Sequence, residues 1–217
     1  VPGNSGADIR EAEADFVDVL AYLRTLEPPK FPGRINANLA APGRAVFEDR
    51  CSGCHGTYGE EAAYPNKVVK LGKVGTDPAR SEFMHRLGFA EHYRKSWYGE
   101  HSKLEATRGY LAPPLDGVWA TAPYLHNGSV PTLAALLDPS VRPKYFVRPR
   151  DSTAYDLDRV GWEHEVLDHG QADEPDLARR AAIYDTTLYG KGNGGHEFGA
   201  ALSAHERRQV LEYLKTL

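Results

Sequence analysis

Residues 51–55 read Cys51-Ser-Gly-Cys-His55 and contain both cysteines of the 217-residue chain. Covalent attachment of haem uses two thiols, which add across the two vinyl groups, and an imidazole that binds the iron from the same side. The Cys-x-x-Cys-His spacing places all three groups on one helical turn and its exit. We therefore expect Cys51 and Cys54 to hold one haem c covalently and His55 to be an axial iron ligand.

Two other classes of Cys-x-x-Cys site fit this sequence poorly. A zinc site would need further cysteines or a clear paired-histidine motif, and no third cysteine exists. A thioredoxin-type redox pair follows a strand, whereas the residues before Cys51 predict a helix. Because cytochromes c mature outside the cytoplasm, the motif also predicts a periplasmic or otherwise extracytoplasmic protein.

Composition and charge exclude two classes of partner. The net charge is −4 and the sequence has no basic face, which argues against nucleic acid. No run of about 18 apolar residues exists, so we expect no membrane span. Hydrophobic residues make up 41% of the chain, so a core is possible but not generous. The first residue is Val1, and we expect a processed chain or a fragment.

The hydrophobic pattern predicts a mainly α-helical fold, that of a cytochrome c-like haem domain with long irregular loops and little strand. A capping box at Ser203-Ala-His-Glu206 opens the last helix. Residues 140–200 are rich in Asp and Gly and read as mostly irregular. The expected helices cover residues 8–26, residues 39–51, a segment opened by Asp77-Pro78 that carries Phe83, Met84 and Leu87, residues 132–137, and residues 203–217.

The ends of the first and last helices resemble each other. Residues 19–26 read Val-Leu-Ala-Tyr-Leu-Arg-Thr-Leu and residues 210–217 read Val-Leu-Glu-Tyr-Leu-Lys-Thr-Leu, so six of eight positions match. Either two amphipathic helices share common residue types, or residues 1–34 form the tail of a preceding cytochrome-like domain. On the second interpretation the haem domain proper covers residues 35–217.

The second axial ligand decides the chemistry of the iron, because two strong ligands leave no position for oxygen or peroxide. Most of the remaining histidines lie in charged stretches and read as surface residues. The candidates are Met84, the only methionine, together with His126 and His196. His196 has glycines on both sides, which let the backbone approach a flat cofactor. The residues alone favour His196 first and Met84 second.

Residues 110–133 read Tyr-Leu-Ala-Pro-Pro-Leu-Asp-Gly-Val-Trp-Ala-Thr-Ala-Pro-Tyr-Leu-His-Asn-Gly-Ser-Val-Pro-Thr-Leu. Together with the motif at residues 51–55, this segment resembles the haem domains of the bacterial di-haem cytochrome c peroxidase superfamily. The likeness is greatest to the C-terminal haem domain of the rubber-oxygenase-like branch, and it covers about residues 18 to 217.

The resemblance assigns roles to several positions. It implies that His126 packs near the haem without ligating it. The methionine that ligates the electron-transfer haem of the peroxidases has no counterpart in residues 133–139. In the rubber-oxygenase-like branch a histidine near the C-terminal helix ligates the iron instead, and His196 matches it. Cytochromes c also orient the proximal histidine through a proline carbonyl, for which Pro113 or Pro114 is the candidate.

These expectations lead to two functional hypotheses and leave open whether the chain is an enzyme. The first is a haem domain for one-electron transfer with six-coordinate His/His iron, whose partner is a redox protein or a second haem domain. The second is a subunit or C-terminal part of a di-haem peroxidase- or dioxygenase-type oxidoreductase whose catalytic haem lies elsewhere.

Two weaker suggestions are a calcium site and pairing of arginines with haem propionates. The calcium candidates are Asp151, Asp156, Asp158 and Glu163, and the arginines are Arg142, Arg148 and Arg150.

Overall fold

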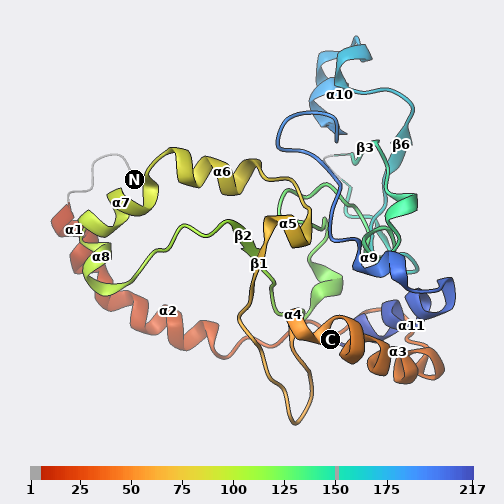
Figure 1. The fold of residues 1–217 in the computed structure, drawn as a ribbon, viewed down its shortest axis with the longest axis horizontal. Helices are drawn as coiled ribbons and strands as arrows, with labels where there is room; N and C mark the ends of the chain where they lie inside the picture. The colour runs from red at the N-terminus through yellow and green to blue at the C-terminus, as the bar shows by residue number, and fades with distance from the viewer. Residues whose placement is uncertain (1–5, 150–151) are drawn as a thin grey trace.

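The computed structural model describes residues 6–149 and 152–217, and it is mainly α-helical with some strand (Figure 1). Its two longest helices that pack together are α3 (Ala37–Arg50) and α11 (Ala204–Leu214), which cross each other. The predicted capping box opens α11, because Ser203 and Glu206 each bind the other's backbone N–H. The Asn36 side chain caps α3 in a similar way, by accepting a hydrogen bond from the backbone N–H of Asn38.

The largest apolar core lies where these two helices meet the middle of the chain. Phe47 of α3 packs at 5.3 Å, ring centroid to centroid, against Tyr213 of α11. Leu133 and Leu137 of α9 (Leu133–Leu137) join the same core. Thr132 caps α9 by accepting from the Ala135 N–H, as the sequence predicts for a helix that starts there.

The other helices are short. The helix predicted after Asp77-Pro78 is α6 (Ala79–Arg86), whose first free N–H, that of Ala79, binds the Asp77 carboxylate. Two of its apolar side chains are exposed, Phe83 to 57% and Leu87 to 59%. The remaining short helices are α4 (Ser52–His55), α5 (Leu71–Val74), α7 (Phe89–Lys95), α8 (Tyr98–His101) and α10 (Leu177–Ala182).

Three small antiparallel sheets complete the described part of the chain. Residues 140–200 contain two of them, so the expectation of a mostly irregular segment was wrong in part. Strands of two or three residues are too short to show an alternating pattern, which is why the sequence did not reveal them. The first sheet pairs β1 (Val68–Lys70) with β2 (Gly109–Leu111), and the second pairs β4 (Tyr155–Asp156) with β5 (Gly161–Trp162). The third has the strand order β6-β3-β7, with β6 at Glu165–Leu167, β3 at Tyr145–Val147 and β7 at Ile183–Asp185.

The predicted N-terminal helix is present, with a 3-10 turn between α1 (Gly6–Glu11) and α2 (Asp15–Leu23). Helix α2 extends away from the α3–α11 pair (Figure 1). The segment that follows α2 is attached to the rest of the structure by Trp119. The indole N–H of Trp119 donates to the Pro29 carbonyl at 2.7 Å. None of the described helices has the length and apolar composition needed to cross a bilayer.

Candidate haem site

The Cys-x-x-Cys-His motif lies on α4, directly after α3 (Figure 1). The Cys51 N–H closes the last turn of α3 on the Phe47 carbonyl, so the core that holds Phe47 also fixes the start of the motif. Cys51 packs against the main core, whereas Cys54 packs against a smaller cluster formed by Val69, Val74 and Ala112. Burial raises the pKa of the Cys51 thiol to about 11.

The His55 ring is oriented by a proline carbonyl, and the structure selects Pro113 of the two sequence candidates. His55 Nδ1 lies 2.8 Å from the Pro113 oxygen. A carbonyl can only accept, so Nδ1 carries the proton and Nε2 keeps a free lone pair. Tyr58 links His55 to the residues that follow Pro113. Its hydroxyl donates to the His55 carbonyl and accepts from the Leu115 N–H.

His196 lies close to His55. It stands at the start of a 3-10 turn with a left-handed backbone conformation, φ +48° and ψ +47°. The centroids of the two imidazole rings are 6.0 Å apart and their planes make an angle of 62°. The structure therefore brings together two residues that are 141 positions apart in the sequence.

This separation is the one that two iron ligands would have. An imidazole nitrogen binds a transition metal at about 2 Å, and the ring centroid lies about 1 Å behind that nitrogen, so two opposed ligands have centroids about 6 Å apart. Two rings that share one axis can turn about it, so an angle of 62° between their planes is compatible with joint ligation. His55 and His196 thus fit a haem iron between them.

The state of His196 also suits a ligand. Burial, and then the nearby His55 ring, lower the pKa of His196 to about 4, so the imidazole is neutral. Its Nδ1 atom is buried without a hydrogen-bond partner. Buried polar atoms without a protein partner are rare, and such an atom is suited to contact a bound group. Neutral imidazole is the form that binds metals.

The loop that carries His196 is bound to three different parts of the chain. The His196 N–H donates to the Val74 carbonyl at 2.6 Å. The Asp77 carboxylate accepts from the Gly192 N–H at 3.1 Å. The Asn127 amide donates to the carbonyls of Gly190 and Gly192, at 3.2 and 2.8 Å. These contacts hold residues 190–196, the His196 loop, against α5 and the turn before α6.

Arg142 is the fourth attachment of the His196 loop, and its role differs from the one expected. Its five N–H groups all donate to backbone carbonyls, so none is free for a haem propionate, and that expectation was wrong. Arg148 donates to the Ser152 carbonyl and its guanidinium stacks 4.2 Å from the Trp162 ring. The third arginine candidate, Arg150, lies outside the described residues. The five carbonyls bound by Arg142 belong to Ala135, Leu136, Asn193, Gly195 and His196.

The two other candidate ligands have other neighbours. Met84 is on α6, belongs to none of the three apolar clusters, and is half-buried. His126 stacks on Tyr110, with ring centroids 4.0 Å apart and an angle of 17°. Burial lowers the pKa of His126, and its Nε2 atom is buried without a partner.

The calcium suggestion gains no support from the described residues. Asp151 lies outside them. The Asp156 carboxylate accepts from the backbone N–H groups of Asp158 and Arg159, as in a tight turn. Among residues 6–149 and 152–217, no group of three or more acidic, histidine or cysteine side chains is placed to hold a metal ion.

Sequence reasoning missed the residues that hold the His196 loop. Asp77 was read only as a helix cap, although its second carboxylate oxygen binds Gly192. Asn127 follows His126 in the Pro-Tyr-Leu-His-Asn-Gly turn that carried the family resemblance, and this position was the available signal. The partners of Arg142 carry no signal in the sequence, because they are backbone carbonyls.

Comparison with known proteins identifies a cytochrome c-like region in the middle of the chain. A family model described as RoxA-like, cytochrome c-like matches residues 109–147. Two curated relatives come from Sinorhizobium fredii (strain NBRC 101917 / NGR234). The uncharacterized protein y4iJ is 32% identical over 260 residues, which cover 88% of this chain and 41% of the relative. The uncharacterized protein y4iM is 29% identical over 238 residues, which cover 91% of this chain and 53% of the relative.

The matched segment contains Pro113, Asn127 and Arg142, which position the two histidines. Residues 109–147 are therefore similar to a RoxA-like, cytochrome c-like domain. Domains of this class bind haem c, transfer electrons and are typically extracytoplasmic. The chain spans about half the length of y4iM and less of y4iJ.

Proposed function

We propose that this domain is a one-electron carrier with a single haem c, attached covalently to Cys51 and Cys54 and ligated by His55 and His196. The observation that carries the proposal is the pair of imidazole rings, those of His55 and His196, with centroids 6.0 Å apart. The haem would supply a one-electron couple, and with two imidazole ligands the iron offers no position to a substrate.

The chain's own residues hold this arrangement and shield it. The Pro113 carbonyl keeps the His55 proton on Nδ1, which directs Nε2 toward the iron position. The cluster of Val69, Val74 and Ala112 gives the site an apolar wall beside Cys54. An apolar wall excludes water, and low solvent access is one of the factors that set the potential of a haem.

Carbon monoxide tests the ligation. The ferrous holoprotein should bind carbon monoxide weakly, and His196→Ala should open the iron and give a five-coordinate or water-ligated spectrum. Met84→Leu and the exposed-site control His205→Ala should leave the optical spectrum unchanged. Ready binding by the unaltered protein, or a spectral change in Met84→Leu alone, would contradict His/His ligation.

We also propose that the domain works beside another haem domain, as the C-terminal part of a di-haem oxidoreductase. The observation behind this is α2. Val19, Tyr22 and Leu23 are 47, 65 and 52% exposed, whereas the matching Val210, Tyr213 and Leu214 of α11 are buried against α3. An equivalent of α3 in a neighbouring domain would cover this face, and the relatives are long enough to contain one.

Haem counting tests the tandem arrangement. The full-length native protein, purified from its own periplasmic or other extracytoplasmic fraction, should carry two haems per chain by pyridine haemochrome assay. One haem per chain would contradict a second haem domain, and recovery from the cytoplasm would contradict the location. A peroxidase or oxygenase reaction belongs to this proposal only if the second haem is present and binds carbon monoxide.

A further inference from the structure

We infer that Arg142 is a positioning residue that fixes His196 at the iron through the backbone of the His196 loop. This inference rests on the proposed ligation by His196. It gives a half-buried arginine a role in setting the strength of an axial ligand whose imidazole the arginine does not touch.

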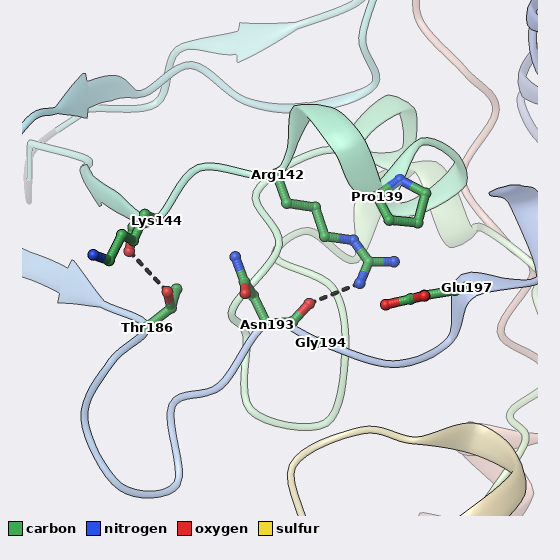
Figure 2. A pocket seen from close by; sticks show the side chains of 7 residues that line it. All are labelled: Pro139, Arg142, Lys144, Thr186, Asn193, Gly194 and Glu197. Atoms are coloured by element: carbon green, nitrogen blue, oxygen red, sulfur yellow. Dashed lines mark hydrogen bonds between the residues drawn. The ribbon is translucent and has the colours of Figure 1, made fainter.

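The guanidinium joins two segments that are distant in the sequence. Its Nε and Nη2 bind the carbonyls of Ala135 and Leu136, at 3.1 Å each. These are among the last carbonyls of α9, which have no partner inside the helix. Its Nη1 binds the carbonyls of Asn193 and Gly195 at 2.7 and 2.8 Å, and Figure 2 shows the guanidinium reaching Asn193.

The contact reaches His196 itself. Nη2 of Arg142 also lies 3.3 Å from the His196 carbonyl, on the residue whose imidazole faces His55. A β-carbon-bearing residue in the left-handed region is strained and persists only where its surroundings fix it. The Val74 carbonyl fixes the N–H side of His196, and Arg142 fixes its carbonyl side.

The charge of Arg142 is not used for an ion pair. Among the described residues, no carboxylate lies within 4.0 Å of its guanidinium, and Glu197 acts on it only at longer range. Burial lowers the pKa of Arg142, so keeping the charge there is costly. A planar fork with five donors is the group that can satisfy five carbonyls at once, and lysine, with three, cannot.

Iron ligation is sensitive to such support. Loss of a group that orients a metal ligand typically weakens metal binding by about 10- to 100-fold. Without Arg142 the His196 carbonyl and the loop carbonyls lose their donor, and the imidazole leaves the iron more often. A haem held at this site would then be more open to an external ligand that competes with His196.

The test compares two arginines in the same region of the holoprotein. Arg142→Ala should raise the carbon monoxide affinity of the ferrous iron by about tenfold or more and broaden the low-spin signal in electron paramagnetic resonance. Arg142→Lys should give a smaller change in the same direction. Arg207→Ala is the control, because Arg207 binds the Gly199 and Leu202 carbonyls and Asp138 but not residues 190–196.

A background that lacks His196 separates positioning from general destabilisation. In His196→Ala the further change Arg142→Ala should have no effect on carbon monoxide affinity, since the two residues act on one step. Equal effects of Arg142→Ala and Arg207→Ala, or no effect of Arg142→Ala, would overturn the positioning role. If Arg142→Ala does not fold, Arg142→Lys against Arg207→Lys decides by the same criteria. If His196→Ala itself leaves the iron closed, the proposed ligation fails instead.

The polar pocket beside Arg142 lies outside the proposed haem contacts. It measures about 240 Å³ and contains none of Cys51, Cys54 and His55. Its lining residues are Pro139, Arg142, Lys144, Thr186, Asn193, Gly194 and Glu197 (Figure 2). Asn193 and Gly194 belong to the His196 loop, so the pocket borders this loop.

Discussion

Gly43 of α3 lies directly against the main-chain carbonyl of Gln209 in α11. A β-carbon at position 43 would overlap this carbonyl group, which is backbone and cannot turn aside. The two helices that frame the core therefore cross where one of them has no side chain. This close approach sets how α11 packs on α3. Phe47 lies in the core between them and its carbonyl accepts from the Cys51 N–H, so the same packing positions the start of the haem motif.

Gly43→Ala should destabilise the protein by roughly 1–3 kcal/mol, because the helices must separate to admit a methyl group. Chemical denaturation of the holoprotein measures the loss. The control is Gly72→Ala in α5, where a β-carbon meets nothing within 4 Å. That variant should be neutral or more stable by up to about 1 kcal/mol. Equal stability of the two variants would contradict the close helix crossing.

The two matching helices offer a matched pair of substitutions. Leu214 is 4% exposed in the core, whereas the equivalent Leu23 of α2 is 52% exposed. Leu214→Ala should cost about 2–5 kcal/mol in the free energy of unfolding, and Leu23→Ala should change it by less than about 0.5 kcal/mol. In the full-length protein Leu23→Ala should become costly, if a neighbouring domain covers α2 as proposed. A large effect of Leu23→Ala in this chain alone would mean that α2 packs on it.

The sequence indicated the helices and the motif because each depends on neighbouring residues. The capping box at Ser203 and the Cys-x-x-Cys-His spacing are local patterns, and the structure contains both. The attachments of the His196 loop are not local. Arg142 meets it across about 50 positions and Asp77 across 115, through backbone groups that any residue type provides. A sequence pattern cannot encode a partner that has no side chain.

His169 should make stability depend on pH near neutrality. Its Nδ1 lies 2.8 Å from the Asp168 carboxylate and its Nε2 lies 3.4 Å from that of Glu174, and these contacts raise the pKa of His169. A raised folded pKa gives stability that is fully present below about pH 6.5 and is lost as pH rises through the folded pKa. Arg179, 3.1 Å from Glu174, keeps that carboxylate charged throughout this range.

Denaturation at about pH 6 and about pH 8.5 measures this loss. The unaltered protein should lose stability between the two values, and His169→Gln should remove that part of the slope. At acid pH the sign reverses, because the Asp176 N–H and His169 lower the pKa of Glu174. That contribution is present above about pH 4.5 and is lost as the pH falls through the lowered pKa of Glu174. An identical slope between pH 6 and 8.5 in His169→Gln would exclude His169 as its source.

Asn127 can be converted to its charged isostere to test the His196 loop from the side opposite Arg142. Its amide nitrogen donates to the carbonyls of Gly190 and Gly192, and its oxygen accepts from the Ser129 N–H. Asn127→Asp keeps the shape and the acceptor but turns a negative oxygen toward two carbonyl oxygens. We expect a loss of roughly 1–3 kcal/mol at neutral pH, partly recovered at acid pH, where the protonated carboxyl can donate again. The ferrous haem should also bind carbon monoxide more tightly.

The control Asn38→Asp makes the same charge change at an exposed position in the first turn of α3, where a negative charge is favourable. If both variants lose stability equally, added charge explains the effect and the loop contact does not.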